Sequence, residues 1–187
     1  KTFRPKNPLD ANRAGVGMVF QEQNLVTTLS VGQNIFFGRE KEFARAGIIN
    51  WTKLYEQADM VLREFGLTHI NARKKISNYS FADRQMVEIA KVIHNTRSSE
   101  GDGAIILLDE PTSVLNNEEC KQLFSHMKKL KERGMAVVFI SHRLDEVMKV
   151  SDRICVLKNG ENAGEFRTDQ VNEDTLYQAM VGKQTNH

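Results

Sequence analysis

The most constraining feature of this chain is a short apolar run that ends in two acids and a proline, I-I-L-L-D-E-P-T from Ile105 to Thr112. A half-exposed strand would alternate apolar and polar residues, and an amphipathic helix would space its apolar residues by three and four. An unbroken run of this length is typical of a strand buried on both faces, in a parallel sheet with helices above and below. Such sheets bind ligands beyond the carboxyl ends of their strands. We therefore expect Asp109 and Glu110 to lie at a ligand-binding edge.

A second apolar run, Ala136–Ile140, predicts a neighbouring strand. The segment between the two runs has helical spacing, with Asn116 and Glu119 as a capping pair and Gly134 as a stop. Strand, helix and strand of this length form a right-handed βαβ crossover, so both strands end at the same edge of the sheet. This geometry predicts that His142, just after the second strand, lies beside the two acids.

The rest of the chain completes an α/β fold. Val16–Phe20 predicts a third strand, which ends at Gln21. Two helical patterns then follow, Trp51–Phe65 and Ser80–Ile93, and the chain closes with a hairpin turning at Asn159-Gly160 and a helix over about Glu173–Val181. We expect residues 1–21 and 95–187 to form the α/β core, a mostly parallel sheet flanked by helices, with residues 22–94 as an inserted helical subdomain.

Composition excludes several classes of protein. Lys and Arg total 26 against 24 for Asp and Glu, a balance that argues against a nucleic-acid binder, and the cluster Arg73 to Lys75 fits a solvated loop. We expect Cys120 and Cys155 to be buried, reduced thiols. The longest apolar run, Met135–Ile140, is far shorter than the roughly 20 residues of a spanning helix. We expect membrane association through a partner only. Since no signal peptide is recognised and the chain opens at Lys1 without a methionine, we also expect it to begin inside a longer protein.

The strand ends carry side chains suited to phosphoryl transfer from a nucleotide. That reaction needs a metal against the phosphates, an oriented water and donors for the developing charge. Asp109 suits a Mg²⁺ ligand through bound water, Glu110 a general base, and His142 a contact to the γ-phosphate. Gln21 could complete the shell of metal and water. Each residue also has a simpler interpretation, in which the acids mark a strand leaving the core and His142 is a hydrogen-bonded histidine or a helix cap.

Ser80 stands where the second helical pattern begins, with Asp83 three residues later as a capping partner. A helix N-terminus offers free N–H groups and a positive dipole end, so it can bind phosphate. From the residues alone, a phosphate site and a plain helix cap are equally good interpretations of Ser80.

These motifs together resemble the ATP-binding cassette (ABC) ATPases. Gln21 resembles the Q-loop, I-I-L-L-D-E-P-T-S the Walker B strand with the start of the D-loop, and I-S-H-R the H-loop. S-F-A-D-R-Q-M-V-E-I-A-K lies where that family has its signature motif. Further resembling runs are F-Q-E-Q-N-L-V, Q-N-I-F-F-G-R-E, I-S-H-R-L-D-E-V and A-M-V-G-K. They span nearly all of the chain and are similar to the first cassette of the sugar-importer ATPases, which carry two cassettes in one polypeptide.

The resemblance implies a P-loop NTPase-like fold, with ATP and Mg²⁺ as cofactors. It implies ATP contacts for Gln21, Asp109 and the signature residues Ser80, Phe81 and Ala82. Two departures matter. No G-x-x-x-x-G-K-[ST] phosphate loop is present, so we expect the segment alone to be inactive. In the signature, Tyr79, Phe81, Ala82 and Arg84 replace the family's residues, and the bulk at the two central positions would hinder a close approach of phosphate.

The function that the resemblance implies is ATP hydrolysis that energises an importer, with a carbohydrate as the expected cargo. The implied partners are a second cassette in the same polypeptide or in a dimer, transmembrane permease subunits and, indirectly, a sugar-binding protein. The implied location is the cytoplasmic face of the cell membrane. Two alternatives remain: a cassette protein of DNA repair or translation, against which the compact helical insertion speaks, and a non-catalytic remnant with a regulatory or pairing role.

Overall fold

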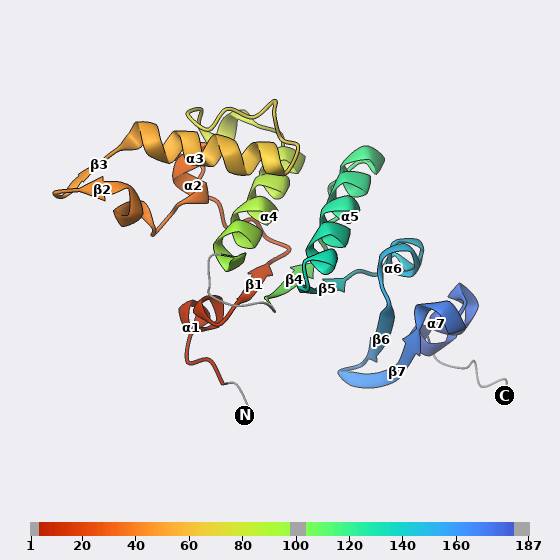
Figure 1. The fold of residues 1–187 in the computed structure, drawn as a ribbon. Helices are drawn as coiled ribbons and strands as arrows, with labels where there is room; N and C mark the ends of the chain where they lie inside the picture. The colour runs from red at the N-terminus through yellow and green to blue at the C-terminus, as the bar shows by residue number, and fades with distance from the viewer. Residues whose placement is uncertain (1–3, 98–103, 182–187) are drawn as a thin grey trace, which may run out of the picture. The chain divides into compact units, whose positions relative to one another are not determined.

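The computed structural model describes residues 4–97 and 104–181 and shows an α/β fold (Figure 1). Its contacts divide the chain into two compact units, residues 1–140 and 141–187. The first unit contains α1 (Pro8–Arg13), β1 (Val16–Val19), α2 (Val31–Ile35), η1 (Glu40–Phe43), β2 (Ala44–Arg45), β3 (Ile48–Ile49), α3 (Trp51–Glu64), η2 (Ile76–Asn78), α4 (Phe81–Arg97), β4 (Ile105–Asp109), α5 (Asn117–Glu132) and β5 (Ala136–Ile140). The second contains α6 (Leu144–Val150), β6 (Arg153–Lys158), β7 (Glu161–Arg167), η3 (Thr168–Gln170) and α7 (Glu173–Val181). The division expected from the sequence, a core with residues 22–94 inserted, stays a prediction.

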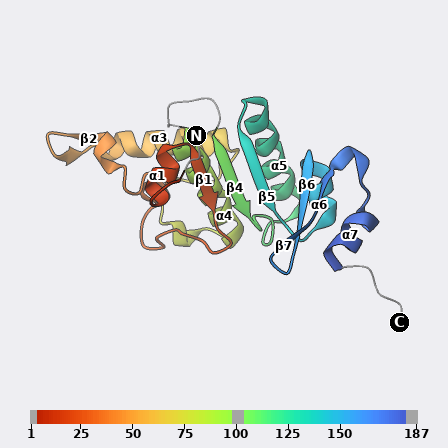
Figure 2. The ribbon, with the colours of Figure 1, turned by 90° about the horizontal axis from the view of Figure 1, so that it is seen from below.

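The centre of the first unit is a parallel sheet of three strands in the order β1-β4-β5 (Figure 2). Val19 pairs with Leu108, and Leu108 pairs with Phe139, so the strands run in register to the same edge. Helix α5 connects β4 to β5 and begins at a capping box in which Asn116 and Glu119 satisfy each other's N–H groups. The predicted βαβ unit and its parallel partner strand are therefore confirmed.

Only one face of this sheet is buried among the described residues. On that face lie Val19, Ile106 and Leu108, each with no exposed surface. Helix α4 packs there so closely that a Cβ on Gly17 would lie 2.2 Å from the Thr96 hydroxyl. Helix α5 covers the same face through an edge-on contact between Phe124 and Phe139.

The opposite face of the sheet is exposed. Met18, Ile105 and Val138 are 37%, 38% and 45% exposed. The prediction that the run at Ile105 is buried on both faces was therefore wrong for the described residues. The reason is that both covering helices, α4 and α5, pack on the same side.

The segment between β1 and β4 is mainly helical, as predicted. Helix α3 buries Leu54, Ala58 and Leu62, and it ends before Gly66, which adopts φ 71°. That left-handed conformation costs glycine little, and it stops the helix. A short hairpin, β2 paired with β3, precedes α3 and was not expected from the sequence.

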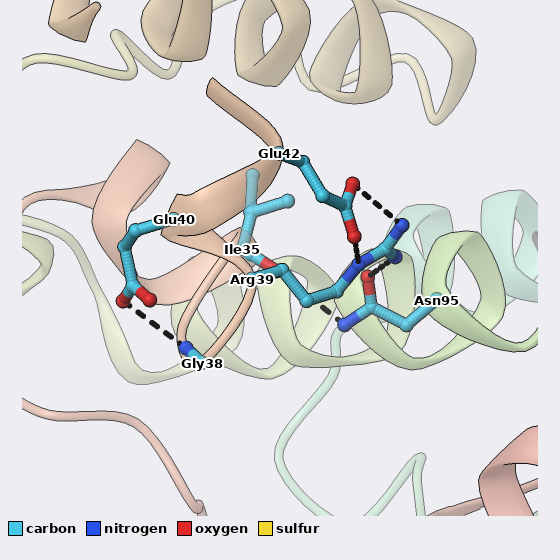
Figure 3. Close-up of polar contacts among 6 residues, drawn as sticks. All are labelled: Ile35, Gly38, Arg39, Glu40, Glu42 and Asn95. Atoms are coloured by element: carbon cyan, nitrogen blue, oxygen red, sulfur yellow. Dashed lines mark hydrogen bonds and ion pairs between the residues drawn. The ribbon is translucent and has the colours of Figure 1, made fainter. Parts of the chain in front are cut away.

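Arg39 joins this segment to α4 (Figure 3). Its guanidinium binds both carboxylate oxygens of Glu42, at 2.6 and 2.9 Å, and donates to Asn95 Oδ1 of α4 at 2.7 Å. The Asn95 amide in turn donates to the carbonyl of Ile35 at 3.4 Å. The chain between α2 and η1 is thus held to the second half of α4.

The second unit is built on the antiparallel pair β6 and β7. Asn159 and Gly160 turn the hairpin with φ of 50° and 81°, as a tight turn with two left-handed residues requires. Leu176 of α7 is fully buried. The predicted hairpin and final helix are confirmed. The expectation that both cysteines are buried holds for Cys120 and was wrong for Cys155, because Cys155 alternates with the buried Ile154 and Val156 and faces away from them. No helix in the described part of the chain is long and apolar enough to span a membrane.

Candidate functional site

Three predicted site residues of the first unit, Gln21, Asp109 and Glu110, lie at the carboxyl edge of the sheet. Asp109 is the last residue of β4, is half-buried and pairs in register with Ile140 of β5. Gln21 follows the neighbouring strand β1 and is exposed. Because β1 and β4 are parallel and adjacent, both residues leave the sheet at the same edge.

Glu110 has an unusual backbone. Its φ is 47°, in the left-handed region that residues other than glycine seldom adopt. Its N–H donates to the carbonyl of Ile140 at 2.9 Å, and its carbonyl accepts from the N–H of Ser113 at 3.3 Å. Strained residues of this kind cluster at functional sites, where surrounding hydrogen bonds hold them. The conformation turns Glu110 out of the strand directly after Asp109.

His142 belongs to the second unit and is exposed. The N-cap of the following helix, α6, is Arg143, so the interpretation of His142 as a helix cap was wrong. Its predicted position beside Asp109 and Glu110 stays a prediction.

Ser80 caps the start of α4. Its Oγ accepts from the N–H of Asp83 at 3.0 Å, and its hydroxyl lies 2.9 Å from Asp83 Oδ2. The other Asp83 oxygen lies 2.7 Å from His69 Nε2. The predicted capping role is confirmed, and phosphate binding by Ser80 stays a prediction.

Phe81 and Ala82 occupy the first turn of α4. The Phe81 ring is exposed, and the Arg84 guanidinium lies 5.5 Å from its centre, in cation–π contact. Ala82 is half-buried. The side chain of Phe81 therefore stands at the helix end where a phosphate would approach.

A hollow of about 650 Å³ joins the loop after β1 to the start of α4. Its lining residues are Gln21, Glu22, Gln23, Leu25, Thr27, Phe81, Arg84, Ser113 and Val114. The structure thus brings Gln21 and Phe81 to one hollow, whereas Asp109 and Glu110 are not among the described residues that line it.

Comparison with known proteins identifies the family. The model of the family described as ABC transporter matches residues 3–113, which is more than half of the chain. The chain belongs to the ABC transporter family. Within this family, the ribose import ATP-binding protein RbsA of Geobacillus kaustophilus is 37% identical over 96% of the chain. The fructose import ATP-binding protein FruK of Bifidobacterium longum is 38% identical over 94%. The chain spans only 35% and 33% of the length of these two relatives.

Solved structures of ABC proteins share the fold. An ATP-binding cassette in a dimeric post-hydrolysis state with ADP and Pi matches with a TM-score of 0.69 and 26% identity, over 87% of this chain and 68% of that one. Another ATP-binding cassette of an ABC transporter matches with a TM-score of 0.72 and 23% identity, over 93% of this chain and 71% of its own. These matches confirm the P-loop NTPase-like fold expected from the sequence.

The residues at the sheet edge fit a Mg²⁺ ion that is held mainly by phosphate and water. Among residues 4–97 and 104–181, no three His, Cys, Asp or Glu side chains gather as a metal cluster. Mg²⁺ typically binds one or two carboxylates and keeps its other positions for water and nucleotide phosphates. The single half-buried carboxylate of Asp109 and the exposed amide of Gln21 agree with that mode.

Sequence analysis did not predict the contacts between the loop after β1 and α4. The Gln23 side chain donates to the carbonyl of Phe81 at 2.9 Å, and the N–H of Asn24 donates to Glu88 Oε1 at 2.9 Å. Lys91 Nζ lies 3.5 Å from the carbonyl of Asn24. We call these three contacts the loop–helix junction. The only available signal was the presence of polar side chains at helical spacing on an otherwise apolar helix.

The junction contains two ionisable groups with altered acidity. Burial raises the pKa of Glu88, while the N–H of Asn24 and the charge of Lys91 act to lower it. Burial also lowers the pKa of Lys91, against the opposing effect of the Glu88 charge. Both groups are therefore kept in a poorly hydrated environment between α4 and the loop.

Proposed function

We propose that this chain is part of the ATP-binding subunit of an ABC importer, in which ATP hydrolysis drives uptake of a carbohydrate. The observation that carries the proposal is the shared edge of the parallel sheet, where Gln21, Asp109 and Glu110 follow adjacent strands. Relatives named as ribose and fructose import ATP-binding proteins support the cargo class.

In this proposal Asp109 and Gln21 hold Mg²⁺ against the phosphates of ATP, and the ion offsets the charge of those phosphates. Glu110 accepts a proton from the attacking water, and His142 contacts the γ-phosphate. The left-handed backbone of Glu110 supports its role, because residues held in this conformation cluster at functional sites.

The proposed partners fit membership of the ABC transporter family and the similarity to import ATP-binding proteins. The start of α4, with Ser80, Phe81 and Ala82, completes the nucleotide site of a second cassette, in the same polypeptide or in a dimer. Permease subunits carry the cargo across the membrane, and a sugar-binding protein delivers it to them. The subunit then lies at the cytoplasmic face of the membrane, and no nucleic acid takes part.

The test is transport itself. The full-length protein, assembled with its permease subunits in vesicles, should hydrolyse ATP with Mg²⁺, and a saturating pentose or hexose with its binding protein should stimulate this activity. The same vesicles with Asp109→Asn should lose both hydrolysis and uptake. Absence of ATP hydrolysis in the wild type would instead favour a non-catalytic pairing role.

A further inference from the structure

We propose that Glu88 and Lys91 are positioning residues that hold the backbone of Asn24 on α4 and thereby determine where Gln21 lies at the nucleotide. This inference rests on the proposed function, because it gives Gln21 a role at ATP. Its geometry, however, is independent of that function.

The backbone of Asn24 is held on both sides of its Cα by one helix. Its N–H donates to Glu88 Oε1 at 2.9 Å, and its carbonyl lies 3.5 Å from Lys91 Nζ. Glu88 and Lys91 are three residues apart, so they lie on the same face of α4, one turn after another. Two residues of opposite charge thus bind the N–H and the C=O of Asn24, which belong to the peptide units before and after its Cα, and this fixes the backbone on both sides of Asn24.

Gln23 adds a second attachment beside the first. Its amide donates to the carbonyl of Phe81 at 2.9 Å and lies 3.4 Å from Gln85 Oε1. Phe81 and Gln85 precede Glu88 at helical spacing, so all these partners lie along one face of α4. Because Gln21 is only two residues from Gln23, we expect a shift of α4 to change the position of Gln21 as well.

Glu88 stabilises the fold less than an apolar residue would at the same buried position. It is 2% exposed, and its second oxygen has no hydrogen-bond partner among the described residues. A buried carboxylate with incomplete partners destabilises a fold relative to an apolar side chain of similar size. We therefore assign Glu88 a role in conformational specificity, since it selects one position for the loop that follows Gln21.

A second link on the same helix provides a matched control. Asn95, farther along α4, binds Arg39 and the carbonyl of Ile35 (Figure 3). Removing this link disturbs an attachment of the same segment to the same helix, but at the end remote from Gln21. Asn95→Ala therefore separates a general loosening of the segment from loss of the position of Gln21.

The experiment compares full-length wild-type protein with Glu88→Ala, Glu88→Gln and Asn95→Ala. Hydrogen exchange of the Asn24 amide reports the junction without any need for activity. ATP affinity and kcat with Mg²⁺ report its consequence. Glu88→Gln keeps an oxygen that can accept from Asn24, so it tests whether the hydrogen bond is sufficient.

Glu88→Ala should speed exchange at Asn24 by at least about tenfold, because a hydrogen bond to a charged group is lost. It should lower kcat by about 10- to 100-fold, with ATP affinity almost unchanged, because the residue positions a group that acts during hydrolysis. Glu88→Gln should retain most of the exchange protection at Asn24 and most of the wild-type kcat. Asn95→Ala should leave Asn24 exchange and kcat near wild type.

Unchanged exchange at Asn24 in Glu88→Ala, or equal damage from Asn95→Ala, would overturn the inference. If Glu88→Ala does not fold, Gln23→Ala replaces it, with a smaller effect expected in the same direction. A wild-type protein that lacks ATPase activity but shows the exchange pattern would contradict the proposed function and not the junction.

Discussion

The N–H of Glu110 donates to the carbonyl of Ile140 at 2.9 Å while Glu110 holds φ at 47°. A hydrogen bond to the neighbouring strand thus accompanies a backbone conformation that costs a residue with a Cβ of order 1 kcal/mol. The residue proposed as general base is therefore also a point of local strain.

This strain predicts a difference between two variants that both lack the carboxylate. Glu110→Gly should be more stable than Glu110→Ala by up to about 1 kcal/mol, because glycine adopts the left-handed conformation freely, although its flexibility in the unfolded state offsets part of the gain. Chemical denaturation of the two proteins measures the difference. Equal stability, or a more stable alanine variant, would mean that the backbone at this position is not strained.

The elements that sequence analysis predicted correctly are those with local causes. The capping box of Asn116 and Glu119 and the turn at Asn159-Gly160 depend on residues a few positions apart, and both occur as expected. The parallel arrangement of β4 and β5 followed from the helix between them.

The features that were missed depend on contacts between distant segments. Asn24 and Glu88 are 64 residues apart, and no local pattern indicates that they meet. The left-handed conformation of Glu110 accompanies a hydrogen bond to Ile140, and the exposed sheet face around Met18 reflects which side α4 and α5 cover. Such features are set by tertiary packing, which overrides local preference.

His142→Ala should impair ATP hydrolysis more than ATP affinity. The proposed contact of His142 is with the γ-phosphate, where interactions strengthen as charge develops in the transition state. Parallel measurement of kcat and of the ATP dissociation constant tests this. A raised dissociation constant with unchanged turnover, or unfolding of the protein, would remove His142 from the reaction.

Ala82→Gly should raise ATPase activity, or the fraction of nucleotide trapped at the site that α4 completes. Removing the Cβ lets the helix start approach a phosphate more closely, and an error of about 1 Å can cost roughly 10²-fold in rate. The same change should destabilise the protein by about 0.5–1 kcal/mol, because glycine weakens a helix relative to alanine.

Ser80→Ala is the companion of that variant. It removes the acceptor for the Asp83 N–H and should cost about 1 kcal/mol of stability as a lost helix cap. If Ala82→Gly leaves turnover and trapping unchanged, the site is either already competent or already inactive. Ser80→Ala distinguishes these two states, because it lowers activity only if the site is competent.

Stability should fall as pH decreases from about 7 toward 5.5, in part because of His126. Burial lowers its pKa, while the carbonyl of Phe65, at 3.1 Å from Nε2, and the charge of Glu64 oppose this and the charge of Lys129 adds to it. Below the ordinary histidine pKa of about 6.5, the unfolded chain binds a proton that the folded chain does not, so acid favours unfolding by at most about 1.4 kcal/mol per pH unit.

His126→Gln isolates this effect, because glutamine keeps a donor for Phe65 and does not titrate. The difference in unfolding free energy between the two proteins should change as the pH falls through the ordinary histidine pKa of about 6.5. Parallel pH profiles for wild type and variant would show that the pKa of His126 is the same in the folded and unfolded states.

The most direct measurement of the central claim is steady-state ATP hydrolysis by the full-length protein with Glu110→Gln, with ATP binding measured in parallel. Glutamine keeps the size of the side chain and removes the proton acceptor, so turnover should fall by about 10²–10⁴-fold while ATP still binds. Turnover near that of the wild type would contradict the role of Glu110 as general base and the account of the site built on it.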